Sequence, residues 1–233
     1  MLEGVREYGR LPQKERFERF HAYSRFLFLT NSEPPMLTTL LTSALLGGPG
    51  GDFRGVDEPM TITDIVLQSG GDFDNDSRDF DILLNAVVTA DLAGVLADPE
   101  ATLTVFAPTD RAFFRLATDL GFESKGGYNE EAVWNFIVGA LTDLGGGDPI
   151  PVLTDVLTYH VAGGDIDVFG FILRSFFGID IETVQGGTIT PFFITLIDND
   201  PDLRNPFLSF PLNVPASNGR IHSISRVLIP VDL

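Results

Sequence analysis

The sequence contains no cysteine among its 233 residues, and this absence removes several kinds of chemistry. Disulfide bonds, thiol catalysis and thiolate metal sites are all excluded. Basic residues are scarce too: 15 lysines and arginines stand against 33 aspartates and glutamates, which gives a formal net charge of −18. Nucleic acid is therefore not an expected partner, because phosphate binding needs clustered basic side chains.

The chain also lacks a long hydrophobic run. Residues 36–46 form an apolar segment near the N-terminus, but eleven residues are too few to cross a bilayer. We therefore do not expect a membrane-spanning protein. The N-terminus is a poor match to a secretory signal peptide, because acidic residues lie near its start and residues 31–35 interrupt the apolar stretch.

Catalytic motifs are missing as well. The sequence has no Gly-x-Ser-x-Gly elbow, no phosphate-binding loop and no His-Glu-x-x-His. Ser223 follows His222 directly, but neighbours along a strand point to opposite faces of a sheet, so the pair does not suggest a nucleophile and its base. We expect a protein that is not an enzyme, because function must be argued from a site and none stands out.

The N-terminal segment differs from the rest of the chain. Residues 1–30 carry six basic and four acidic side chains, a net charge of +2, so the remainder must carry −20. Between residues 12 and 29, apolar residues recur at steps of three and four, which predicts an amphipathic helix. Its apolar side carries Phe17, Phe20, Tyr23 and Leu27. We interpret residues 1–46 as a helical arm and the Gly/Pro-rich residues 47–60 as a linker.

The aromatic side of this arm predicts a contact, because so many aromatic side chains rarely stay exposed to water. The four residues of that side are therefore candidates for binding a protein partner or a second copy of the chain, as amphipathic helices do in grooves. Packing of the helix on its own domain is the alternative.

The residues after position 60 read as helices followed by strands, which indicates an α+β domain over residues 61–233. Apolar residues at helical spacing predict helices over residues 81–96 and 130–141. Thr188–Ile197 reads as a strand in which Pro191 marks an edge or a bulge.

Two further segments are expected to form strands in the core of the domain. Thr104–Phe106 reads as a strand that ends before Pro108, and Thr109 or Asp110 is expected to cap the helix that follows. Asn218-Gly219 predicts a hairpin turn, after which a period-2 pattern runs to Pro230. Four apolar residues of these segments are expected in the core: Val105, Phe106, Ile221 and Val227.

Three segments, in this order, resemble the signature of a fasciclin-like domain: Thr104–Phe113, Leu157–Val161 and Asn218–Pro230. Thr183–Gly187 stands at the expected place between the last two. The resemblance covers residues 61–233. It implies a wedge of two small β-sheets flanked by helices, here preceded by the arm. It also implies a non-catalytic module for protein–protein interaction, in adhesion or structural assembly.

The resemblance implies an extracellular, cell-surface or periplasmic location, although no clear signal peptide is present. It also links the Tyr159-His160 pair to receptor binding, which makes both residues interaction candidates. The alternative for His160 is a partly buried ring whose nitrogens are bonded to neighbouring groups. Two other functions remain open: an accessory subunit anchored to a larger complex through the arm, and a surface module that binds Ca²⁺ or a glycan.

Carboxylates that alternate along a loop suggest the Ca²⁺ alternative: Asp72, Asp74 and Asp76. The run is similar to the start of an EF-hand loop. It departs from that pattern at the sixth position, where Ser77 replaces glycine, and at the twelfth, where Leu83 replaces glutamate. The alternative is a solvated acidic loop in which Asp79 or Asp81 caps the next helix. No other cofactor is expected.

Overall fold

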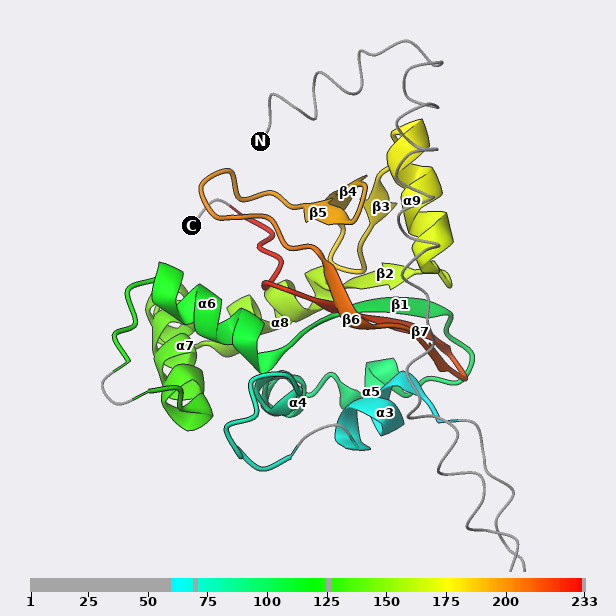
Figure 1. Ribbon diagram of the computed structural model, residues 1–233. Helices are drawn as coiled ribbons and strands as arrows, with labels where there is room; N and C mark the ends of the chain where they lie inside the picture. The colour runs from blue at the N-terminus through cyan, green and yellow to red at the C-terminus, as the bar shows by residue number, and fades with distance from the viewer. Residues whose placement is uncertain (1–59, 69–70, 125–126, 232–233) are drawn as a thin grey trace, which may run out of the picture. The chain divides into compact units, whose positions relative to one another are not determined.

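The computed structural model describes residues 60–68, 71–124 and 127–231, and Figure 1 shows how their helices and strands are arranged. The predicted arm, and all of the predicted linker except residue 60, lie outside the described residues. The helices are α3 (Ile62–Gln68), α4 (Asp81–Thr89), α5 (Ala93–Leu96), α6 (Asp110–Asp119), α7 (Glu130–Leu144), α8 (Ile150–Tyr159) and α9 (Val168–Phe177). The strands are β1 (Leu103–Pro108), β2 (Val161–Gly163), β3 (Ile181–Glu182), β4 (Thr188–Phe192), β5 (Thr195–Ile197), β6 (Leu208–Ala216) and β7 (Gly219–Ile224).

The larger of two small sheets has the strand order β2-β1-β7-β6. Strand β1 pairs with β7 in parallel, from Leu103 opposite Gly219 to Pro108 opposite Ile224. The other two pairings, β1 with β2 and β6 with β7, are antiparallel. Gly219 has a φ of +146°, and a Cβ atom there would lie 1.8 Å from the carbonyl oxygen of Leu103. Only glycine therefore allows the two strands to meet at this end.

The smaller sheet has the order β3-β4-β5, and α9 packs against β4. Figure 1 shows this sheet and α9 on one side of the larger sheet, with α3, α4 and α5 on the other. Two sheets flanked by helices confirm the predicted α+β class.

The core is divided in two because successive side chains of a strand point to opposite faces. Val105 and Ala107 of β1 join a cluster with residues of α3, α4, α6, α7 and α8. Phe106, between them, joins the second cluster with Tyr159 and Phe171. The four residues expected in the core are all buried, with at most 5% of any of them exposed, so that prediction is confirmed: Val105, Phe106, Ile221 and Val227.

The capping of the helices differs from the prediction. Thr109 occupies the N-cap position of α6, but its side chain makes no capping hydrogen bond. The Asp110 carboxylate instead accepts hydrogen bonds from the backbone N–H groups of Asp81, at 3.1 Å, and Ile82, at 2.9 Å. It therefore caps α4, a helix that begins 29 residues earlier in the chain. Neither Asp79 nor Asp81 caps that helix, which was the expected alternative.

Three predicted elements are interrupted or shorter. The helix expected over residues 81–96 is broken between α4 and α5, where Asp91 has a φ of +55°. The strand expected over residues 188–197 is a hairpin, β4 and β5, with Phe193 at a φ of +53°. The final strand ends at Ile224 and does not continue to Pro230. Positive φ values reverse the chain locally, and residues of these types give little warning of them in the sequence.

The hairpin turn near position 218 also forms hydrogen bonds to other elements of the domain. Ala216 pairs with Gly219, so the turn residues are Ser217 and Asn218, one position earlier than expected. The buried Asn218 amide accepts a hydrogen bond from the Ile62 N–H and donates to the carbonyl oxygens of Leu96 and Asp98. One side chain thus ties the hairpin to the start of α3 and the end of α5.

Truncation of Phe106 should test this core. Its ring is fully buried, 6.2 Å from the ring of Phe171 and 6.1 Å from that of His222, measured between centroids. We expect Phe106→Ala to lower the free energy of unfolding by about 3–5 kcal/mol, as measured by urea denaturation. Phe210, which is 79% exposed, provides the control, and Phe210→Ala should change that free energy by less than about 0.5 kcal/mol. Equal losses in the two variants would contradict the assignment of Phe106 to the core.

Candidate functional site

Tyr159 and His160, the two interaction candidates within the domain, lie at the end of α8. Tyr159 is the last residue of the helix, and His160 is its C-cap. The side chains come from a helix that opens with Pro151 in its first turn, where the missing N–H costs no helical hydrogen bond. Both residues are buried, with 0% of Tyr159 and 2% of His160 exposed.

Hydrogen bonds to the backbone satisfy both ring nitrogens of His160. Nε2 accepts from the Leu228 N–H at 2.9 Å, so the ring proton must lie on Nδ1, which donates to the Val156 carbonyl oxygen at 2.8 Å. Burial lowers the pKa of His160 to about 4, because the charged ring would lose its hydration. The neutral ring therefore joins the end of α8 to the segment after β7.

Tyr159 also forms a hydrogen bond to the backbone. Its hydroxyl donates to the carbonyl oxygen of Thr188 in β4 at 2.7 Å. A Cβ atom at position 187 would lie 2.9 Å from the Tyr159 ring, so the ring packs directly over the backbone of Gly187. Burial raises the pKa of Tyr159, which keeps the hydroxyl protonated as the donor.

The Tyr159-His160 pair thus connects α8 to the smaller sheet and to the C-terminal segment. Neither side chain reaches the surface of the described domain. Their part in binding a partner stays a prediction, and it would act through the packing of the segments that they join.

His222, the other histidine of the described residues, carries its proton on the opposite nitrogen. Its Nδ1 accepts from the Asn213 N–H at 3.3 Å, so Nε2 donates to the Ile166 carbonyl oxygen at 2.8 Å. The ring is 1% exposed, and burial lowers its pKa. With both nitrogens bonded to the backbone, neither His160 nor His222 is placed to take a proton from a substrate.

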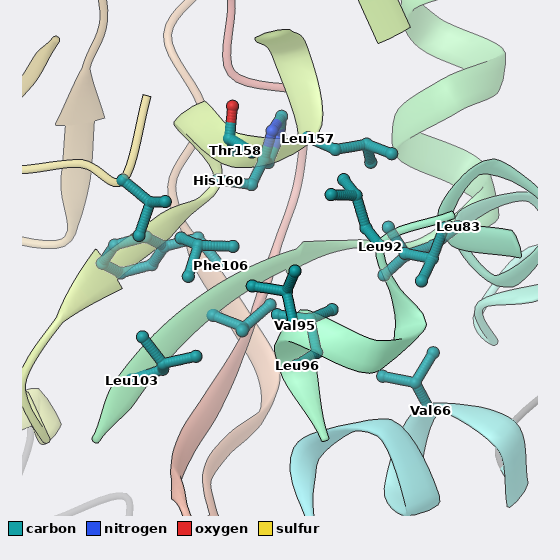
Figure 2. A pocket seen from close by; sticks show the side chains of 14 residues that line it. Val66, Leu83, Leu92, Val95, Leu96, Leu103, Phe106, Leu157, Thr158 and His160 are labelled. Atoms are coloured by element: carbon teal, nitrogen blue, oxygen red, sulfur yellow. The ribbon is translucent and has the colours of Figure 1, made fainter. Parts of the chain in front are cut away.

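The cavity beside His160 is small and apolar. Figure 2 shows Val66, Leu83, Leu96 and Leu103 among its lining residues, and its volume is about 50 Å³. Ligand pockets usually hold several hundred Å³ and a few convergent polar groups. This cavity is therefore a gap in the packing between β1, α8 and the helices α3 to α5.

The most exposed aromatic helix of the described domain is α9, which was not predicted. Phe169 and Phe177 are 57% and 61% exposed, and Ile179, just after the helix, is 48% exposed. We call these three residues the α9 patch. The two phenylalanines lie eight residues apart, about 12 Å along a helix axis. Ile179 also lines an open hollow of about 550 Å³ beside the helix.

Two sequence signals could have identified this helix. The Asp167 carboxylate accepts from the Gly170 N–H and caps the N-terminus, while Gly178 ends the helix at a φ of +68°. Short apolar runs such as those in α9 do not separate a helix from a strand in the sequence, so the helix was not predicted.

The three aspartates expected to bind Ca²⁺ have different surroundings in the structure. Asp72 is exposed, and the Asp76 carboxylate pairs with the Arg78 guanidinium at 3.0 Å. Asp74 offers an oxygen to a different group, with Asp81 and Glu130, in which the three oxygens lie within 4.8 Å of one another. A Ca²⁺ site on the alternating run stays a prediction, and one member of the run, Asp74, joins two buried carboxylates.

The arm candidates cannot be placed, because Phe17, Phe20, Tyr23 and Leu27 lie outside the described residues. Within the described ranges, no helix is both long and apolar enough to traverse a bilayer.

The neutral His160 ring makes a pH-dependent contribution to stability. The unfolded chain binds a proton near the ordinary pKa of 6.5, whereas the folded ring does so only near 4. The contribution of the neutral His160 ring to the free energy of unfolding is therefore complete above pH 6.5 and is lost as the pH falls toward 4. A difference of about 2.5 in pKa corresponds to about 3 kcal/mol.

We expect His160→Gln to be less stable than the parent at pH 7. The difference in the free energy of unfolding between the two proteins should shrink by up to about 3 kcal/mol at pH 4. Urea denaturation of both proteins across this range measures the gap. Asp198, whose pKa burial raises to about 6, titrates in both proteins and cancels in the difference. A gap that is constant with pH would show that the folded ring is charged or exposed.

Comparison with known proteins assigns the family. The family model for the fasciclin domain matches residues 78–138, which include α4, β1, α6 and the start of α7. An uncharacterized protein of Synechocystis sp., sll1735, is 30% identical over 150 residues, which are 64% of this chain and 89% of that protein. A solved FAS1 domain pair from the insect cell adhesion molecule fasciclin I is 14% identical, with a TM-score of 0.49, over 73% of this chain and 51% of that one. The chain belongs to the fasciclin domain family.

Proposed function

We propose that this chain is a non-catalytic protein-interaction module that serves adhesion or structural assembly. Fasciclin domains are generally associated with these roles and are generally non-catalytic. The α9 patch is the observation that carries the proposal for this chain, because it exposes two phenylalanines and an isoleucine around one short helix. Aromatic side chains that a single domain leaves exposed are typical of protein interfaces, where binding of the partner buries them.

The occupant that we propose for the α9 patch is the N-terminal segment of a second copy. Residues 12–29 carry aromatic side chains at helical spacing, which would match an apolar surface. That segment lies in the basic part of the chain, whereas the hollow beside Ile179 is lined by the exposed Asp180 and Glu182, with Arg174 as its basic residue. Opposite charge around an apolar centre favours this pairing over one between two acidic domains.

A location at the cell surface, outside the cell or in the periplasm follows from the usual setting of the family and is part of the proposal. An accessory subunit that binds a larger complex through the same N-terminal segment is the second candidate. It shares the basic and aromatic character of residues 12–29 but replaces the second copy with an unrelated protein.

Solution mass tests the assembly. We expect the full chain to form dimers or larger species at micromolar concentration, and deletion of residues 1–35 to leave a monomer with a nearly unchanged melting temperature. The double variant Phe169→Ser and Phe177→Ser should weaken association by about tenfold or more, since hot-spot side chains each contribute over about 1 kcal/mol. Val88→Ser is the matched control, because Val88 is 59% exposed on α4. Mass photometry or light scattering measures each species.

Added salt should weaken the association in part, because it screens the charges and leaves the apolar contact. A monomeric full chain would contradict self-association and favour the accessory-subunit candidate. If the deletion unfolds the domain, the N-terminal segment belongs to the core. If the α9 variant assembles like the parent, the interface lies elsewhere.

A further inference from the structure

A buried acidic cluster lies where the loop of residues 71–80 meets α4, α6 and α7. Its carboxylates form two overlapping groups of three, and in each group the oxygen atoms lie within 4.8 Å of one another. Asp74, Asp81 and Glu130 form the first group, and Asp79, Asp81 and Asp110 form the second. Asp81, Asp110 and Glu130 are at most 1% exposed. We call these five residues the acidic cluster.

Hydrogen bonds satisfy only part of this cluster. One oxygen of Asp81 accepts from the Gly71 N–H, and one oxygen of Glu130 accepts from the Asn75 N–H at 2.8 Å. The other oxygens of these two buried side chains, Asp81 Oδ2 and Glu130 Oε1, have no hydrogen-bond partner. Asp79 Oδ1 and the hydroxyl of Tyr128 are also buried without a well-aligned partner, although Asp79 lies beside Asp110 and Tyr128 lies beside Glu130. Four buried oxygens without a well-aligned hydrogen bond need an explanation, because buried polar atoms are almost always bonded.

Ion pairs with basic side chains of the described residues do not explain the unpaired oxygens. The ion pairs within residues 60–68, 71–124 and 127–231 lie elsewhere: Arg78 with Asp76, Arg220 with Asp165, and Arg226 with Asp119. Several carboxylates buried together repel one another unless a positive charge or a shared proton lies between them. A bound cation and a shared proton are therefore the two explanations to separate.

The geometry points to a divalent cation, and we propose that the acidic cluster binds Ca²⁺. The ligands are the free oxygens of Asp81 and Glu130, completed by Asp79 or Asp74 and by water. Two oxygens bound to one Ca²⁺ lie at most about 4.6–5.2 Å apart, and the oxygens of each group lie within 4.8 Å of one another. Donors that are all oxygen favour Ca²⁺ or Mg²⁺ over Zn²⁺. The irregular arrangement favours Ca²⁺, because Mg²⁺ requires near-ideal octahedral geometry.

The proposed site differs from the exposed run of Asp72, Asp74 and Asp76, of which it keeps only Asp74. It would also have a structural consequence. Asn75 and Glu130 bond to each other twice, and Asp110 caps α4, so the loop and three helices already meet here. A cation would cross-link the same parts through their charges. Binding would therefore stabilise the domain, by an amount that rises with the logarithm of the cation concentration once this exceeds the Kd.

Calcium titration of the full chain, freed of metal with a chelator at neutral pH, tests the proposal. Calorimetry should show saturable binding, and the melting temperature should rise with Ca²⁺ concentration. Mg²⁺ should bind at least about tenfold more weakly. Asp81→Asn and Glu130→Gln keep the shape of each side chain but remove its charge. Each should weaken Ca²⁺ binding by about tenfold or more, because affinity depends on the number of charged ligands.

Asp76→Asn is the matched control, since that carboxylate pairs with Arg78 outside the cluster and its loss should leave the affinity within about twofold. If Asp81→Asn does not fold, Glu130→Gln carries the test, with Tb³⁺ luminescence and its displacement by Ca²⁺ as a second readout. A wild-type chain that shows neither binding nor a shift in melting temperature would overturn the proposal and favour the shared proton. Binding that survives in Glu130→Gln, or that favours Mg²⁺, would overturn it as well.

Discussion

The parallel pairing of β1 with β7 is the contact on which the rest of the domain depends. It joins residues more than a hundred positions apart, and the first helices, the second sheet and the C-terminal segment are all built around it. Both strands lie inside the larger sheet, so each presents side chains to two apolar clusters. The absence of a side chain at Gly219 is what lets the strands approach at one end.

Buried polar side chains then hold the surrounding elements to this pair of strands. Asn218 fixes α3 and α5 to the hairpin, His160 fixes α8 to the segment after β7, and Tyr159 fixes it to the smaller sheet. Each of them bonds to backbone groups, so it specifies a position in the fold and not a chemical reaction. The two described histidines show this most clearly, because their neutral rings use opposite tautomers to serve two backbone acceptors.

Much of the architecture could be predicted from the sequence, because its signals are local. The Pro108 corner, the turn near Asn218 and the helical spacing of residues 130–141 each depend on neighbouring residues. Predictions failed where distant residues decide the outcome. Thr109 or Asp110 was expected to cap the helix that follows, and only the folded chain shows that Asp110 caps α4. Of the acidic cluster, the sequence pointed only to Asp74 as a ligand, because Glu130 is more than fifty residues away and no spacing in the sequence brings the two together.

The exposed α9 patch was harder to predict from sequence, because only the structure shows which residues of this helix are left uncovered. The period of a sequence reports burial on one face. It does not separate a helix covered by its own domain from one that is covered by another chain.

The parallel strands also set an order of events during synthesis. Strand β1 leaves the ribosome long before β7, which is the last strand of the described residues and the one that completes the centre of the larger sheet. Contacts between segments so distant form late, because the chain between them must first be made and its ends brought together. The apolar face of β1 and the helices around it therefore stay uncovered while more than a hundred residues are added, and this interval is when the nascent domain is most open to aggregation or to chaperones.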